Sequence, residues 1–265
     1  MVAVLHLPDT FVLERRSAPD ALMEAVVDHW ETHLRQRLKQ TQPLPLGLAT
    51  GRTMVPFYAA LVRRLQAWSD AERNQLRHGW LSFNLDEYVG LGTRHPASFA
   101  AFMREHLGDA LGLGPHQLRV PDGAAPNPDL EARCYRDSLL DAGGIGLQLL
   151  GLGSNGHVGF NEPPCEADAV CRCVQLCLAT QQQNAGAFGG DAQQVPAQAI
   201  TMGLSEILAA QEVHLIVTGA SKATILERVF AAGCDPSLPA SWLLRHPCVR
   251  LWVDDAALGV GVAAR

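Results

Sequence analysis

The sequence predicts an α/β protein with a single doubly wound, mostly parallel sheet and helices on both faces, a Rossmann-like arrangement. Three observations support this prediction. Six or seven short apolar runs are typical of buried strands, most are followed by apolar residues at helical spacing, and no segment is repeated. With 265 residues the chain can form one large core, and we expect one domain over residues 1–265.

Composition and charge narrow the functional classes. The chain is 48% hydrophobic and 18% charged, which is ordinary for a globular protein, and its net charge of −6 argues against a nucleic-acid surface. No apolar run approaches the roughly 20 residues of a membrane span, and the N-terminus lacks a signal-peptide pattern. Seven irregularly spaced cysteines indicate reduced thiols, so we expect a cytoplasmic protein without nucleic-acid or membrane partners.

The first half of the chain is predicted to alternate strands and helices. A β-prone run stopped by Pro8 indicates an edge strand, and Ser17 before Pro19 indicates a helix cap. The expected strands cover residues 1–13, 46–49, 80–85 and 118–121, and the expected helices cover residues 17–39, 54–65 and 96–107.

The second half continues the same pattern around a weakly patterned middle. Leu130, Cys134 and Leu140 indicate a helix that ends at Gly143 and Gly144. A segment around 164–195, rich in Ala, Gly and Gln, is expected to be a surface loop or lid with one strand near 174–178. The remaining expected strands cover residues 145–152, 213–218 and 249–253, and the remaining helices cover residues 198–210, 221–230 and 239–245.

A glycine-rich run follows the strand at 145–152 and carries three polar groups, Asn155, His157 and Glu162. Ligands in open α/β sheets bind beyond the carboxyl ends of the strands, so this run is the first candidate site. The alternative is a plain connection whose histidine caps a helix or fills a polar gap. Four glycines in the run favour a specially shaped backbone.

Two further strand ends carry candidate groups. Thr50, Gly51, Arg52 and Thr53 join a short strand to a helix, where free N–H groups and the helix dipole favour an anion, although a capped turn is the alternative. Lys222 opens a later helix and is a second candidate phosphate ligand, or simply a solubilising charge. Asp86 and Glu87 end the strand at 80–85. One of them is a candidate general base, and the alternative is a cap or solvated charge.

Four segments together resemble the sugar-phosphate isomerase/deaminase family that includes glucosamine-6-phosphate deaminase and 6-phosphogluconolactonase. The segments run GLATGRT from Gly47, FNLDEYVGL from Phe83, LGLGSNGHVGFNEP from Leu150, and TGASK from Thr218. The lactonase branch typically carries a DGHTASLFP-type run and lacks the Asn-Glu-Pro found here at residues 161–163.

The resemblance implies conversion of glucosamine 6-phosphate and water into fructose 6-phosphate and ammonia, without a metal or organic cofactor. Asp86 matches the base that removes the C2 proton, which requires a buried carboxyl with a raised pKa. His157, oriented by Glu162 and held by Asn155, matches the group that moves a proton at the ring oxygen. The phosphate is expected on the turn at 50–53 with Lys222.

The sequence also departs from the family pattern. A phosphate-binding arginine expected on the lid is replaced by Gly186, and the hypothesis is that Arg52 supplies the missing guanidinium. Of two basic residues expected at an allosteric site, Arg172 is present and the other is Val174, so activation by N-acetylglucosamine 6-phosphate is not expected. The partner is then a small amino-sugar phosphate, and a homo-oligomer and a monomer both remain open.

Other functions stay open from the sequence. The protein could also be a galactosamine-6-phosphate isomerase or a 6-phosphogluconolactonase-like hydrolase. These differ from a glucosamine-6-phosphate deaminase by too few substrate contacts to be distinguished by a sequence pattern. A non-catalytic sugar-phosphate sensor is the alternative from another class. The presence of the expected base, histidine and glutamate argues against the sensor, as does the absence of room for a DNA-binding module at the short N-terminus.

Overall fold

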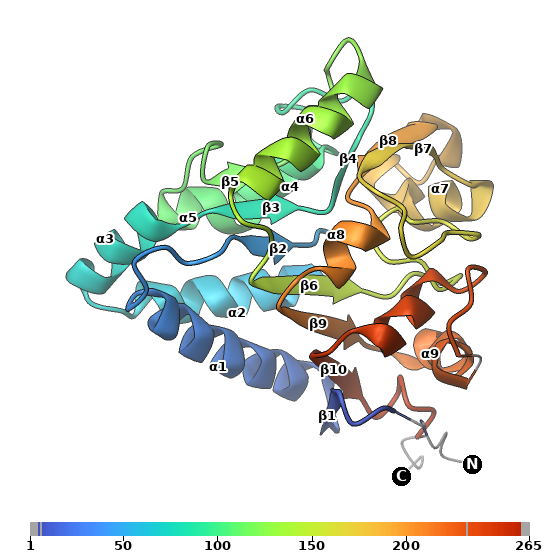
Figure 1. Ribbon diagram of the computed structural model, residues 1–265, viewed down its shortest axis with the longest axis horizontal. Coiled ribbons are helices and arrows are strands. Elements are labelled where there is room, and N and C mark those ends of the chain that lie inside the picture. Colours follow the sequence, from blue (N-terminus) through green and yellow to red (C-terminus); the bar gives the residue numbers. More distant parts are fainter. Residues whose placement is uncertain (1–4, 6, 232, 261–265) are drawn as a thin grey trace.

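The computed structural model describes residues 5, 7–231 and 233–260 and is built on a seven-stranded parallel sheet (Figure 1). This sheet confirms the predicted fold class. Its strands read as apolar runs because parallel strands are buried on both faces. In spatial order they are β1 Phe11–Arg16, β10 Val249–Asp254, β9 Glu212–Val217, β6 Leu147–Gly151, β2 Leu46–Leu48, β3 Ser82–Asn84 and β5 Leu118–Arg119.

The direction of strand addition reverses between β2 and β6. From β2 the chain adds β3 and then β5 on one side, and from β6 it adds β9 and then β10 on the other. Loops that leave the carboxyl ends of such neighbouring strands diverge and open a crevice. The turn after β2 and the glycine-rich loop after β6 are therefore neighbours at the reversal.

Helices that connect strands on one side of the reversal lie on one face of the sheet, and those on the other side lie on the opposite face, because the crossovers are right-handed (Figure 1). Helix α3 was not predicted, although Ser69 and Glu72 form a capping box at its start. None of the helices in the described ranges combines the length and hydropathy that crossing a bilayer requires. The helices are α1 Pro19–Arg37, α2 Met54–Gln66, α3 Asp70–Gly79, α4 Phe99–Met103, α5 Asp109–Leu111, α6 Pro128–Asp141, α7 Leu178–Asn184, α8 Leu204–Leu208 and α9 Ala223–Ala231.

A second sheet, which the sequence did not predict, has three antiparallel strands in the order β4–β8–β7. Figure 1 shows it on the side toward which β6 points. The helix predicted over residues 198–210 is wrong in its first part, which forms β8, and only α8 is helical. The three strands are β4 Asp86–Tyr88, β8 Gln198–Thr201 and β7 Arg172–Gln175, and their small apolar core comprises Tyr88, Phe160, Leu176, Ala185, Val195 and Ala199.

Two predictions near the N-terminus are corrected. The edge strand is β1, which begins after Pro8 rather than before it. Leu5 and Leu7 belong to no strand, and Val2 and Val4 lie outside the described residues. Helix α1 begins one residue later than the Ser17 cap implied, with Ala18 at the N-cap and no side-chain cap.

The residues that indicated helix α6 do not lie on its buried face. Leu130 and Leu140 are 50% and 53% exposed, and Cys134 is exposed. The hydroxyl of Tyr135 donates to the backbone oxygens of Asn84 and Arg119 at the ends of β3 and β5. Because a buried hydroxyl needs such partners, the tyrosine face turns inward and the leucine face outward.

A polar group lies at the centre of the packing between α1 and the sheet. His214 on β9 is fully buried, and its Nδ1 accepts the indole N–H groups of Trp30 at 3.1 Å and Trp252 at 3.2 Å. Since Nδ1 accepts, Nε2 carries the proton of the neutral ring and donates to Glu212 at 2.9 Å. Burial lowers the pKa of His214 to about 4, so the ring is neutral at physiological pH.

We predict that His214→Leu lowers the free energy of unfolding by about 2–4 kcal/mol, because two buried indole N–H groups lose their acceptor. Urea unfolding measures the change. The control is His116→Leu, at an exposed histidine with no hydrogen bond to a described residue, which should change stability by less than about 0.5 kcal/mol. A loss below about 1 kcal/mol in His214→Leu would contradict the proposed role of the ring.

Candidate active site

The loop after β6 is shaped around the imidazole of His157. A Cβ at Gly153 would lie 2.3 Å from the ring, so only glycine fits there. Gly156 and Gly159 have φ of +89° and +57°, a region that other residues rarely adopt. The ring is 7% exposed. These constraints distinguish the loop from a plain connection and favour the site interpretation.

Asn155 stands between the imidazole and the carboxylate of Glu162. Its amide N–H donates to Glu162 Oε2 at 2.8 Å, and its amide oxygen accepts from His157 Nδ1 at 2.6 Å. The direct distance from His157 Nδ1 to Glu162 Oε2 is 3.7 Å, so Glu162 orients the ring mainly through Asn155. We name this chain of three residues the imidazole relay.

The relay fixes the tautomer of His157. A carboxylate only accepts, so Asn155 must present its amide N–H to Glu162 and its oxygen to the ring. The ring nitrogen Nδ1 therefore carries the proton, and Nε2 of the neutral ring has a free lone pair. Burial lowers the pKa of His157, the Glu162 carboxylate raises it, and the Lys222 ammonium lowers it. The net direction is downward, so the ring starts as a neutral proton acceptor.

Asp86 and Glu87 share a strand, β4, rather than following one, and the structure separates their environments. Glu87 accepts backbone N–H groups of Tyr88, Phe99 and Ala100, each at 2.9 Å, and so caps α4. Asp86 is 6% exposed and accepts no hydrogen bond from a described residue. Burial first, and then the charge of Glu87, raise the pKa of Asp86 to about 8, which confirms the expected burial and direction of shift.

The second sheet brings Asp86 against the imidazole loop. Asp86 pairs with Thr201 across β4 and β8, and the hydroxyl of Thr201 accepts the N–H of Phe160 at 3.1 Å. The Cβ position of Gly159 lies 3.5 Å from Asp86 Oδ2. Two trans peptide units span at most about 7.6 Å, so the Cα of His157, two residues earlier in the chain, lies within that distance of the Cα of Gly159. The carboxylate therefore lies against the loop that carries the relay.

The turn after β2 and Lys222 form a cationic corner. Gly51 takes φ of +106°, and α2 starts at Met54, so the positive end of its dipole faces the turn. Lys222 ends a 3₁₀ helix, Ala220–Lys222, before α9. Its pKa is lowered by burial and by the charge of Arg52, which places the two cations near each other. Neither forms an ion pair with a described carboxylate, an arrangement suited to an anion.

The segment around 164–195 touches the imidazole loop at several points, including a hydrogen bond of 2.9 Å from Arg172 to the side-chain oxygen of Asn161. Ser154 donates to Gln183 on α7 at 2.7 Å, and the thiol of Cys177 donates to Glu162 Oε2 at 3.4 Å. Cys177 was not among the site residues expected from the sequence, because a cysteine between two leucines carries no catalytic pattern. Gly186, at the position where the family pattern has a phosphate-binding arginine, lies exposed in the 3₁₀ helix Ala185–Phe188 and has no side chain to bind a phosphate.

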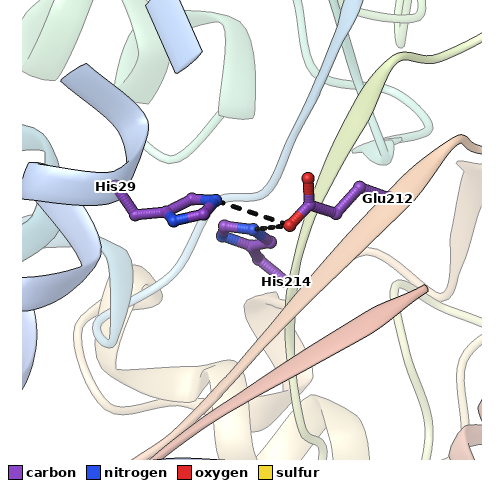
Figure 2. A group of neighbouring side chains, drawn as sticks. All are labelled: His29, Glu212 and His214. Carbon is purple, nitrogen blue, oxygen red and sulfur yellow. Dashed lines mark hydrogen bonds and ion pairs between the residues drawn. The ribbon is translucent and has the colours of Figure 1, made fainter. Parts of the chain in front are cut away.

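One group in the described ranges has metal-ligand chemistry. Figure 2 shows His29, Glu212 and His214, whose ligand atoms lie within 4.8 Å of one another. Because Nδ1 of His214 accepts two indole N–H groups, the proton of the neutral ring lies on Nε2. Nε2 donates this proton to Glu212 and therefore has no lone pair with which to bind a cation. Arg250 Nε lies 3.7 Å from Glu212 and adds positive charge. The cluster therefore fits a structural network better than a metal centre.

Two hollows of about 350 and 290 Å³ lie around α3, and none of the candidate site residues lines either of them. The first is bordered by Arg73 and Arg77, which already donate to backbone oxygens of Gln66, Trp68 and Leu111. Their polar groups are satisfied by the protein. The converging unsatisfied groups lie instead at the strand ends.

Comparison with known proteins agrees with this geometry. Residues 17–252 match the family described as glucosamine-6-phosphate isomerases/6-phosphogluconolactonase. A glucosamine-6-phosphate deaminase of Shouchella clausii is 37% identical over 227 residues, 86% of this chain and 90% of that protein. One of Hahella chejuensis is 40% identical over 223 residues, 83% of each chain.

Solved structures extend the comparison. A monomeric glucosamine-6-phosphate deaminase superposes with a TM-score of 0.86 at 28% identity, covering 94% of this chain and 99% of that one. A 6-phosphogluconolactonase from Shewanella baltica superposes with a TM-score of 0.73 at 16% identity over 94% and 99% of the two chains. At that identity the second likeness concerns the fold alone.

Proposed function

Because the chain belongs to the glucosamine-6-phosphate isomerase/6-phosphogluconolactonase family, we propose that it converts glucosamine 6-phosphate and water into fructose 6-phosphate and ammonia. The observation that carries this proposal is the unpaired, buried Asp86 beside the imidazole relay. Deamination by isomerisation needs a carboxylate strong enough to take a proton from carbon and a second group that opens the sugar ring.

In this proposal the cationic corner holds the phosphate. Lys222 acts as a point charge, Arg52 offers a planar guanidinium that can bind two oxygens, and the start of α2 adds its dipole. The corner anchors one end of the sugar, so the other end lies over Asp86 and His157. Binding energy from the phosphate then orients the reacting carbons.

Ring opening is assigned to His157. Its neutral Nε2 takes the proton of the C1 hydroxyl and returns it to the ring oxygen as the C1–O5 bond breaks, giving the open-chain aldehyde. The lowered pKa of His157 suits this step, because a ring that starts neutral can accept before it donates. Glu162, acting through Asn155, stabilises the transient imidazolium.

Proton transfer between carbons is assigned to Asp86. Its carboxylate removes the C2 proton, the electron pair moves toward the C1 carbonyl, whose oxygen takes a proton from the substrate ammonium group, and a neutral enolamine forms. The resulting carboxylic acid returns the proton to C1 and leaves an iminium at C2. Water adds to C2 and ammonia departs, which leaves the ketone of fructose 6-phosphate. Desolvation makes Asp86 a stronger base than an exposed carboxylate, whose pKa is near 4.

We predict ammonia release from glucosamine 6-phosphate, measured in a coupled assay beside galactosamine 6-phosphate and 6-phosphogluconolactone. The glucosamine substrate should have the highest kcat/KM. A higher value with galactosamine 6-phosphate would change the assigned epimer. Hydrolysis of the lactone without any ammonia release would replace the proposed reaction.

We predict that Asp86→Asn lowers kcat at least about a thousandfold and does not lower the Tm at pH 8. The folded-state pKa of Asp86 is raised, so its ionisation destabilises the fold progressively as pH rises from about 4 to 8, and a neutral amide avoids that cost. The wild-type kcat/KM should rise with pH through about 8, since the ionised form is the base. A flat profile between pH 5 and 8 would contradict the assignment.

We predict that Arg52→Ala raises KM about five- to thirtyfold with a smaller change in kcat, because a phosphate contact is lost in ground and transition state alike. Arg52→Lys should recover part of the affinity. Arg63→Ala is the matched control, because Arg63 is an exposed arginine on α2, the helix that follows the turn, and pairs with Glu24. An unchanged KM in Arg52→Ala would show that Arg52 does not take the place of the arginine that is missing from the lid.

A further inference from the structure

Glu162, the outer member of the imidazole relay, depends on few donors. Its Oε2 accepts from Asn155 at 2.8 Å and from the thiol of Cys177 at 3.4 Å, whereas its Oε1 is buried and has no partner among the described residues. A carboxylate held by two donors on one oxygen can rotate when either is removed. The thiol is thus one of two contacts that fix its direction.

We propose that Cys177 is a positioning residue that holds the Glu162 carboxylate toward Asn155 and thereby keeps His157 in its active tautomer. The catalytic consequence rests on the proposed function, because it matters only if His157 moves a proton. The structural consequence for the ring does not. Cys177 itself touches no reacting atom.

The backbone around Cys177 fixes where its sulfur lies. The carbonyl of Cys177 accepts the N–H of Gln181 at 3.0 Å, which starts α7, and Gln183 on the same helix accepts from Ser154 in the imidazole loop. The thiol lies 3.5 Å from the hydroxyl of Thr180 and 3.4 Å from Glu162. Of these two acceptors the charged carboxylate is the stronger, so the S–H proton turns toward Glu162.

The effect reaches the ring through the amide of Asn155. Two contacts hold the Asn155 amide with its N–H outward and its oxygen toward the ring: the carboxylate accepts the N–H at 2.8 Å, and the backbone N–H of His157 donates to the oxygen at 3.2 Å. If the carboxylate turns away, only the longer backbone contact still holds the amide, so the Nδ1–H tautomer is less firmly specified. Two charged groups face His157, Glu162 and Lys222. Loss of the first leaves the second, together with burial, to lower the pKa of the ring further.

The test compares Cys177→Ala and Cys177→Ser with Cys134→Ala, a control at an exposed cysteine on α6. We expect Cys177→Ala to lower kcat about three- to tenfold with little change in KM, and to move the limb of the kcat profile that reports His157 to lower pH. Cys177→Ser keeps a donor and should stay within about twofold of wild type. Cys134→Ala should match wild type.

Nitrogen-15 NMR of the histidine rings gives a readout that does not depend on turnover. In wild type the Nε2 of His157 should be the unprotonated nitrogen, and in Cys177→Ala the signals should show mixed tautomers and a lower pKa. Wild-type kinetics and ring signals in Cys177→Ala would overturn the inference. Equal losses in the alanine and serine variants with unchanged ring signals would overturn it as well, since packing alone would explain them. Absence of ammonia release by wild type would reject the proposed function, and the NMR comparison would still decide the role of Cys177.

Discussion

The site depends on one constraint, the burial of the Asp86 carboxylate without a counter-charge. Its neighbour Glu87 is buried too, and burial raises its pKa to about 7, but three backbone N–H groups hold it at the start of α4. Asp86 has no such donor among the described residues, and burial raises its pKa from 3.8 to about 8, so its ionisation costs the folded state free energy. A fold that tolerates such a cost needs a large core elsewhere, and the packed parallel sheet provides it.

Two sheets cooperate to place that carboxylate. The chain leaves β3 at Asn84 and enters β4 two residues later, so Asp86 sits where the parallel sheet ends and the antiparallel sheet begins. The parallel sheet positions the imidazole loop and the cationic corner, because β2 and β6 adjoin at the reversal of strand order. The small sheet lies on the side of the parallel sheet toward which β6 points (Figure 1). Neither sheet alone brings base and relay together.

The sequence predicted the parallel sheet well and the small sheet poorly, for a physical reason. Strands buried on both faces lie within continuous apolar runs, whereas β4, β7 and β8 mix polar with apolar side chains. The buried face of α6 does not follow from its leucines, because a hydrogen bond of Tyr135 orients the helix. The candidate site residues were expected from motif chemistry, but the place of Asn155 between His157 and Glu162 depends on a turn that residue identity does not reveal.

The departure at Gly186 changes how binding and catalysis are connected in the proposed mechanism. A guanidinium on the segment around 164–195 would tie closure of that segment to the phosphate. Arg52 instead lies on the turn after β2, so in the proposal the phosphate is held by the loops of the parallel sheet. The segment contacts the imidazole loop at Ser154, Asn161 and Glu162, the last of which belongs to the relay. Its position therefore affects the proton-transfer group rather than the anchor, and changes in the segment should alter turnover more than affinity.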